Sequence, residues 1–532
     1  MTDRTAILAS PAAPQPSDTT SVRADRHALY ILVSGFLIVL GFKLLLIGNF
    51  NPITPFWDQW DAEGAVLYTP IIEGHFNWAV LISSQNEHRI LFTRITNLGV
   101  FYGVGLWYPA LQMVVNSFIH CTTIFIVVYL LTRGIKIYAR SIAILAMTLV
   151  YVIPFDVENT LAGFQSQFYF VILFSVLSIY LISEASAFSG MWIAGLMLSV
   201  ASYFSMSSGS LTAVTASVVM ALQLAVGARR PSAREYVAVS VCVLLSVIEV
   251  LNMQVVAFDD AQYGAHSLSA FVKALIVQMS YPFHMPYGLL QYTPSVILLF
   301  QVLKRKPGLR AYEWSALAIV LWLASQLIAI SYGRSIAVKT SRYTDTQILG
   351  LVANLGIAFY LLRNRWSTHA VNIFDRWRWL LILCVMVVAL GAGTIRFGRI
   401  EYARARTFGE HLRRQTENTK TFLQTGDISA LQDKPFLDVP YPDPQRLAIL
   451  LSEPTIRSIL HPDLTGRPLR QDLLLPVWLS KIIRDVLLLV MHSGRIFIGI
   501  GIGMWLAVPV ASQWSRERMR RKQTAGIPNR AP

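Results

Sequence analysis

The feature that most constrains this chain is the recurrence of apolar segments long enough to cross a lipid bilayer. About 20 apolar residues span the hydrocarbon core. Twelve segments approach this length, at residues 28–47, 108–132, 141–153, 166–183, 191–206, 210–227, 236–257, 286–303, 313–331, 345–362, 379–395 and 494–511. Two of them are short, and residues 271–284 are a further re-entrant or interfacial candidate. Only helices and closed barrels span membranes, so we expect an all-α, polytopic bundle of eleven to thirteen transmembrane helices.

The composition agrees with a membrane bundle. Charged residues make up 14% of the 532 positions and hydrophobic residues 54%, whereas a soluble domain carries about a quarter charged residues. The net charge of +15 does not require a nucleic-acid partner, because Lys and Arg cluster in alternate loops, for example in residues 133–140, 229–234 and 304–310. By the positive-inside rule these loops and both termini face the cytoplasm.

The sequence divides into five parts, at residues 1–27, 28–395, 396–493, 494–511 and 512–532. The first, rich in Pro, Ser and Thr, is expected to be a disordered cytoplasmic tail. The second is the transmembrane bundle, which includes a large first outer loop at residues 48–107. The third is a Pro-rich outer segment, the fourth the last transmembrane helix, and the fifth a basic cytoplasmic tail.

The outer segment at residues 396–493 is expected to form a small helical subdomain. Asp443 followed by Pro444 is typical of a helix N-cap with proline in the first turn. Leu447, Leu450 and Leu451 then fall on one face of that helix.

The first outer loop holds an acidic pair flanked by aromatic residues. Asp58 and Asp61 are three residues apart and share one face of a helix. Converging carboxylates suit general-base chemistry or divalent-metal binding, although such a pair is also found as solvated loop acids. Trp57 and Trp60 are candidates for stacking on a sugar ring, and interfacial anchoring is the alternative.

A second acidic cluster, Asp156 and Glu158, lies in the short outer turn between the third and fourth apolar segments. Uncompensated carboxylates are costly so close to a membrane. Both clusters are expected on the same membrane face. Lys43, near the outer end of the first span, is expected to extend its ammonium to the headgroups.

Cations in the outer loops run against the positive-inside tendency. Arg334, Lys339 and Arg342 precede the span at 345–362. A lipid phosphate would explain them, because arginine binds phosphate bidentately. Snorkelling or pairing with Asp345 is the alternative. Further candidates for substrate or phosphate binding are Glu87, His88, Arg89 and Gln165.

This arrangement of motifs resembles the GT-C superfamily of membrane glycosyltransferases, and bacterial polytopic membrane proteins of the same layout. The resemblance is carried by segments 57–61, 87–89 and 158–167 and covers roughly residues 28–185. It implies a polyprenyl-phosphate-linked sugar donor, a glycan, lipid or protein acceptor, and a place on the outer face of the bacterial inner membrane.

The resemblance also implies roles for individual residues. Asp58 or Asp61 would be the catalytic carboxylate, and Asp156 with Glu158 the second motif. A metal-dependent enzyme would hold Mg²⁺ or Mn²⁺ among these four. Many members of the superfamily place two acids side by side, whereas this chain spaces them Asp-x-x-Asp, so the identity of the base stays open.

Two other functions remain open from the sequence. A transporter or flippase for a lipid-linked saccharide would show an internal repeat, and none is clear. A polymerase or ligase acting on polyprenyl-diphosphate glycans would depend on outer arginines. The glycosyltransferase hypothesis requires the two acidic clusters to meet in one outward-facing cavity.

Overall fold

The computed structural model describes residues 18–253, 263–336, 340–366, 373–467 and 475–507. In this part of the chain nearly all regular structure is helical, and the strands are limited to a hairpin of β1 (Ser84–Gln85) and β2 (His88–Arg89). The all-α bundle predicted from the sequence is confirmed. Residues 1–17 and 512–532 of the two predicted tails lie outside the described residues, whereas residues 18–27 form the beginning of α1.

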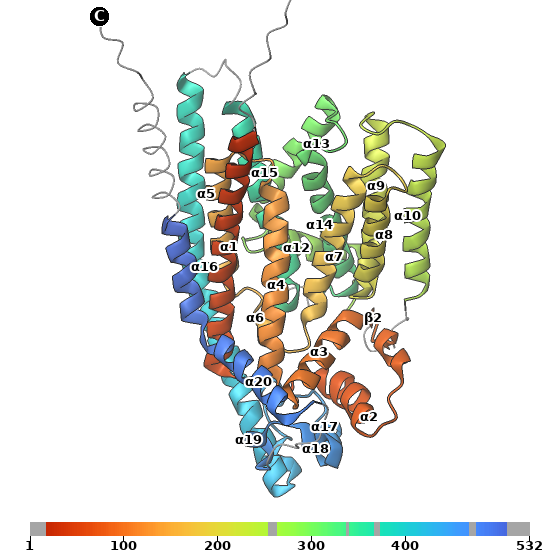
Figure 1. Cartoon of the computed structure of the whole chain (residues 1–532), viewed down its shortest axis with the longest axis vertical. Coiled ribbons are helices and arrows are strands. Elements are labelled where there is room, and N and C mark those ends of the chain that lie inside the picture. The colour runs from red at the N-terminus through yellow and green to blue at the C-terminus, as the bar shows by residue number, and fades with distance from the viewer. Residues whose placement is uncertain (1–17, 254–262, 337–339, 367–372, 468–474, 508–532) are drawn as a thin grey trace, which may run out of the picture.

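Each of the twelve predicted spans overlaps a helix, and these helices run side by side (Figure 1). They are α1 (Asp18–Phe50), α4 (Pro109–Thr132), α5 (Ile137–Val152), α7 (Ser166–Glu184), α8 (Gly190–Tyr203), α9 (Leu211–Ala225), α10 (Ala233–Leu251), α13 (Thr293–Arg305), α14 (Tyr312–Gly333), α15 (Thr344–Trp366), α16 (Ile373–Thr425) and Gly494–Ala507. The interfacial candidate at 271–284 overlaps α12 (Leu268–Ser280).

Fewer helices meet the length and composition of a full membrane span than the sequence predicted. Six qualify among the described residues, and a seventh is formed if α20 (Val477–His492) and Gly494–Ala507, bent by 58°, count as one span. Helices α5 and α8 have 16 and 14 residues. At about 1.5 Å per residue they are shorter than the hydrocarbon core of about 30 Å.

The last helix packs on α1 through glycines. The Ser34 hydroxyl donates to the carbonyl of Gly501 at 2.6 Å, and a Cβ on Gly494 would lie 2.6 Å from the Gly41 carbonyl oxygen. Gly501 belongs to the Gly499–Gly503 stretch in which the spacing of small residues indicates close helix packing.

Helix α16 connects the bundle to the segment after residue 396. The sequence predicted that a span at 379–395 ends where the outer segment begins at residue 396, but α16 is one helix of 53 residues that continues across this boundary. It is therefore about 80 Å long, and Figure 1 shows it running from one end of the bundle to the other.

The two long loops form one subdomain at one end of the bundle, which we call the end subdomain (residues 51–108 and 408–467). Helices α17 (Pro444–Ser452), α18 (Pro454–Ile459) and α19 (Pro462–Thr465) lie at the same end of the bundle as α2 (Thr69–Ile72) and α3 (Leu91–Val104) (Figure 1). The backbone N–H of Trp107 donates to the Ile459 carbonyl at 2.8 Å. The outer loop and the outer segment were predicted as separate elements, but they share one apolar core, which includes Trp60, Tyr68, Phe101, Trp107, Leu447, Leu450 and Ile456.

The predicted start of α17 is confirmed. The Asp443 side chain accepts hydrogen bonds from the backbone N–H groups of Gln445 at 2.9 Å and Arg446 at 3.1 Å. Leu447, Leu450 and Leu451 are buried in the shared core.

A buried carboxylate joins the end subdomain to the bundle. Glu63, in the π-helical turn η1 (Trp60–Tyr68), accepts hydrogen bonds from Gln59 at 3.1 Å, Gln112 at 3.0 Å and Trp107 at 2.9 Å. Asn97 donates to its other oxygen. Burial raises the pKa of Glu63, and these four donors counteract part of that rise. Gln112 belongs to α4, so this network aligns the subdomain on the bundle.

We predict that Glu63→Ala lowers the free energy of unfolding by about 3 kcal/mol or more, because it leaves several buried donors without an acceptor. Glu63→Gln keeps one acceptor oxygen and is expected to cost less. Thermal unfolding of the purified protein in detergent measures both. The control Glu417→Ala removes an exposed carboxylate of α16 and should change stability by less than about 0.5 kcal/mol. Equal shifts for Glu63→Ala and Glu417→Ala would contradict the prediction.

Candidate functional site

A polar cavity of about 470 Å³ lies where the end subdomain meets the bundle. It brings together side chains from both acidic motifs and from the cationic loop. Its polar and aromatic lining includes Trp57, Asp58, Glu87, His88, Glu158, Gln165, Gln167, Arg334, Arg342, Tyr343 and Phe436.

The first acidic motif is held in the cavity wall by the end subdomain. Trp57 adopts a φ of 53°, a left-handed conformation that costs a bulky residue about 1–3 kcal/mol. The backbone N–H of Trp57 donates to the Pro440 carbonyl at 2.6 Å. Its ring packs edge-on against Phe436, with the ring centroids 5.3 Å apart. These contacts orient the next residue, Asp58, whose half-buried side chain lines the cavity.

The hairpin supplies a second wall. Arg334 Nη2 donates to Glu87 Oε1 at 2.6 Å, and His88 Nδ1 lies 2.8 Å from the Ser207 hydroxyl. Burial alone would raise the pKa of Glu87, but nearby His88 and Arg334 outweigh it and lower that pKa. The carboxylate is therefore ionised and paired at neutral pH.

Glu158 pairs with Arg342 across the cavity's inner wall. Arg342 Nε lies 3.3 Å from Glu158 Oε2, and its guanidinium stacks over the Trp57 ring at 5.0 Å. The backbone N–H of Glu158 donates to the Ser341 hydroxyl at 3.1 Å. These contacts join α6 (Val157–Thr160) to the turn η5 (Ser341–Tyr343).

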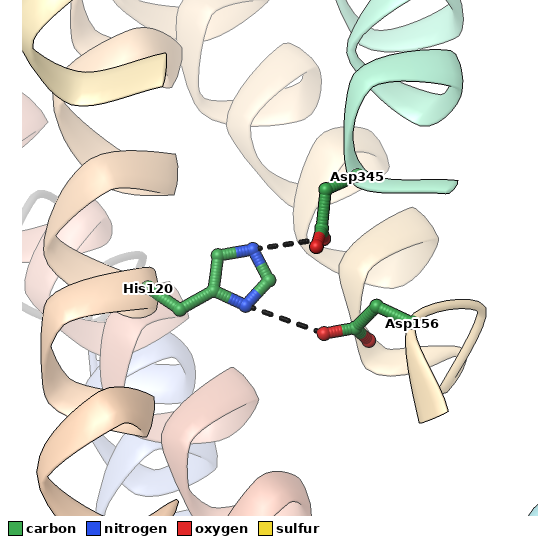
Figure 2. Close-up of side chains that lie close together, drawn as sticks. All are labelled: His120, Asp156 and Asp345. Carbon is green, nitrogen blue, oxygen red and sulfur yellow. Dashed lines mark ion pairs between the residues drawn. The ribbon is translucent and has the colours of Figure 1, made fainter. Parts of the chain in front are cut away.

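Behind this wall lies a buried ionic cluster from four elements. Figure 2 shows His120 of α4 between two carboxylates, with Nδ1 3.4 Å from Asp156 Oδ2 and Nε2 3.1 Å from Asp345 Oδ1. Lys43 Nζ of α1 donates to the same Asp156 oxygen at 2.7 Å. Burial would raise the pKa of Asp156, but Lys43 and His120 outweigh it and hold that pKa well below its usual range.

This cluster reaches the cavity through Asn159. Its amide donates to Asp345 Oδ2 at 2.8 Å and to the Arg342 carbonyl at 2.9 Å. The cluster therefore holds in place the two backbone segments that carry Glu158 and Arg342.

The four acids that the resemblance assigns to a metal do not form one ligand group among the described residues. Among the described residues, only His120, Asp156 and Asp345 form a group of three or more carboxylate, imidazole or thiolate ligands, with atoms within 4.8 Å of one another. Asp156 Oδ2 already accepts from Lys43 and from Thr160 at 2.9 Å, so an ammonium supplies the positive charge that a divalent ion would bring. The cluster is therefore better suited to a charge-balanced structural network than to Mg²⁺ or Mn²⁺.

Several predicted residues lie elsewhere. Asp61 is not among the residues that line the cavity, and it pairs with Arg446 at 2.7 Å and with the Tyr441 hydroxyl. Trp60 is fully buried against Trp107, so its ring faces cannot stack on a sugar. Asp156 lies in the ionic cluster.

One of the expected phosphate ligands, Arg89, is not among the described residues that line the cavity. Arg89 Nη1 donates to the Ile82 carbonyl at 2.7 Å, and its Nε donates to the Tyr203 hydroxyl. Lys339 lies outside the described residues.

The sequence does not predict the ionic cluster, and the expectation that Lys43 extends to the headgroups is wrong. Lys43 does not reach the headgroups, because Asp156 and Thr160 bind it within the bundle. His120 and Lys43 each interrupt an apolar span, and an ionisable residue in such a span indicates a buried partner or a functional site. That signal was available for both.

No protein-family model matches the chain, and a search of curated proteins finds nothing similar to it. Its function has to be inferred from the site itself.

We predict that Lys43→Met and Asp156→Asn each destabilise the protein by about 3–5 kcal/mol, because each leaves a buried charge without its partner. The double variant should lose clearly less than the sum of the two single losses. Apparent unfolding temperatures in detergent provide the comparison, with exposed Lys420→Met as the control. Strictly additive losses would show that the two groups are not coupled.

Proposed function

We propose that this protein is a membrane glycosyltransferase that transfers a sugar from a polyprenyl-phosphate carrier to a cell-envelope glycan, lipid or protein. The observation that carries the proposal is the cavity in which Asp58, Glu158, Arg334 and Arg342 meet beside an aromatic wall. The expected location is the outer face of the bacterial inner membrane.

A second, apolar groove of about 440 Å³ supports a lipid-linked substrate. Its lining is almost entirely hydrocarbon and aromatic, and includes Phe155, Phe283, Leu290, Leu351, Leu355 and Phe397. Phe155 lines this groove and Glu158, three residues later, lines the cavity. A polyprenyl chain in the groove would therefore bring its phosphate to the turn that carries Glu158.

In the proposed reaction, Asp58 is the general base. It takes the proton from the acceptor hydroxyl as that oxygen attacks the anomeric carbon, and the bond from that carbon to the phosphate oxygen breaks. The bonding pair leaves with the phosphate, and a single displacement inverts the anomeric centre. Asp61 has no role in the proposed transfer, because it is not among the residues that line the cavity.

The leaving phosphate would be stabilised by Arg342 and Arg334. Each contacts one carboxylate, Glu158 or Glu87. A guanidinium has five N–H donors, so one such contact does not exhaust its capacity for an anion. In this proposal Glu158 orients Arg342, and Trp57 contributes an aromatic surface for the sugar.

We predict that Asp58→Asn lowers sugar transfer by about 10²–10⁴-fold, the usual contribution of a general base. Arg342→Ala should also reduce transfer, through loss of phosphate stabilisation. The measurement is incorporation of labelled sugar by membranes supplied with a panel of polyprenyl-phosphate hexoses and pentoses, at matched expression levels.

Asp61→Asn serves as the matched control for Asp58→Asn, since it neutralises an acid of the same motif outside the cavity. It should retain most activity. Loss only in Arg342→Ala would favour a polymerase or ligase of polyprenyl-diphosphate glycans. Unchanged envelope glycan in every variant would reject the enzyme and favour transport.

A further inference from the structure

A third groove, of about 450 Å³, lies between the last turns of α1 and helix α16. Its α1 wall is formed by Phe42, Leu45, Leu46, Asn49 and Phe50, and its α16 wall by Tyr402, Arg406, Glu410 and Arg413. It differs in position from the apolar groove, to which α16 contributes Gly393 and Phe397. At 100° per residue, Phe397 and Arg406 point to opposite sides of α16.

The groove has an apolar half and a cationic half. Phe42, Leu45 and Leu46 belong to the membrane-spanning part of α1, which ends at Phe50. Arg406 and Arg413 therefore stand level with the end of that span, where lipid headgroups lie. The Arg406 side chain is 82% exposed, so its guanidinium is accessible from the groove.

The end of the groove is shaped by close packing of Phe50 on α16. The ring of Phe50 leaves no room for a Cβ on Gly409. The Arg413 guanidinium lies over that ring at 5.6 Å, and Arg413 Nη2 is 3.5 Å from the Asn49 carbonyl. These contacts hold Arg413 at the mouth of the groove.

The charges favour an anion. Glu410 lies 3.3 Å from Arg406, so two guanidinium groups face one carboxylate and the groove carries a net positive charge. Arginine binds phosphate oxygens through paired N–H donors. A free phosphate would leave the apolar half in contact with water, whereas a lipid would fill both halves.

We propose that this groove binds a glycerophospholipid of the leaflet at the end subdomain, with its phosphate between Arg406 and Arg413. One acyl chain then lies along Phe42, Leu45 and Leu46. The site is separate from the proposed transfer reaction, and its role is to anchor α16, and with it the end subdomain, to the membrane surface.

Delipidated full-length protein in detergent is titrated with phosphatidylglycerol, and bound lipid is counted by native mass spectrometry. We expect one tightly held phosphatidylglycerol. The variant Arg406→Gln/Arg413→Gln should bind it about tenfold more weakly. Lys420→Gln/Arg467→Gln, which removes two exposed cations outside the groove, should bind it as the wild type does.

Two further probes separate this site from non-selective solvation by lipid. Diacylglycerol has the chains without the phosphate, and inorganic phosphate has the anion without the chains, so both should bind much more weakly than phosphatidylglycerol. Leu45→Trp, which fills the apolar half, should displace the lipid while both arginines remain. Equal binding by the two double variants, equal retention of diacylglycerol, or full binding by Leu45→Trp would overturn the proposal. Unfolding temperatures verify that each variant is folded.

Discussion

The cavity depends on the ion pair between Lys43 and Asp156. A carboxylate withdrawn from water at a membrane boundary is costly unless a partner of opposite charge accompanies it. Lys43 of α1 supplies this partner, with its Nζ 2.7 Å from Asp156 Oδ2. His120 and Asp345 extend the pair into a cluster that joins α1, α4, the α6 turn and α15. Because Asp156 is held inward, the same turn presents Glu158 to the cavity on its other side.

The end subdomain completes the other half of the site. Its core consists of residues far apart in the chain, such as Trp60, Trp107 and Leu450, and it holds Trp57 in a strained conformation through Pro440 and Phe436. Glu63 then aligns this subdomain on α4. The position of Asp58 relative to Glu158 therefore depends on both the ionic cluster and the aromatic packing of the subdomain.

The structure assigns different tasks to residues that look alike in the sequence. Asp58 and Asp61 were equivalent candidates, but only Asp58 lines the cavity, whereas Asp61 contacts Arg446 and Tyr441. Trp57 and Trp60 were both candidates for sugar stacking, and only Trp57 lines the cavity. In contrast, the start of α17 at Asp443 was predictable, because an N-cap and the apolar face after it are local features.

The sequence by itself determined that the chain forms a helical membrane bundle with polar motifs in its first long outer loop and in short outer turns. Apolar segments of this length must leave water whatever their neighbours, and backbone hydrogen bonding then requires helices. Tertiary structure alone decided which charges meet. Asp156 and Glu158 are two residues apart, yet one faces Lys43, 113 positions away, and the other Arg342, 184 positions away. Such pairings depend on how the helices pack, which the spacing of residues along one helix does not specify.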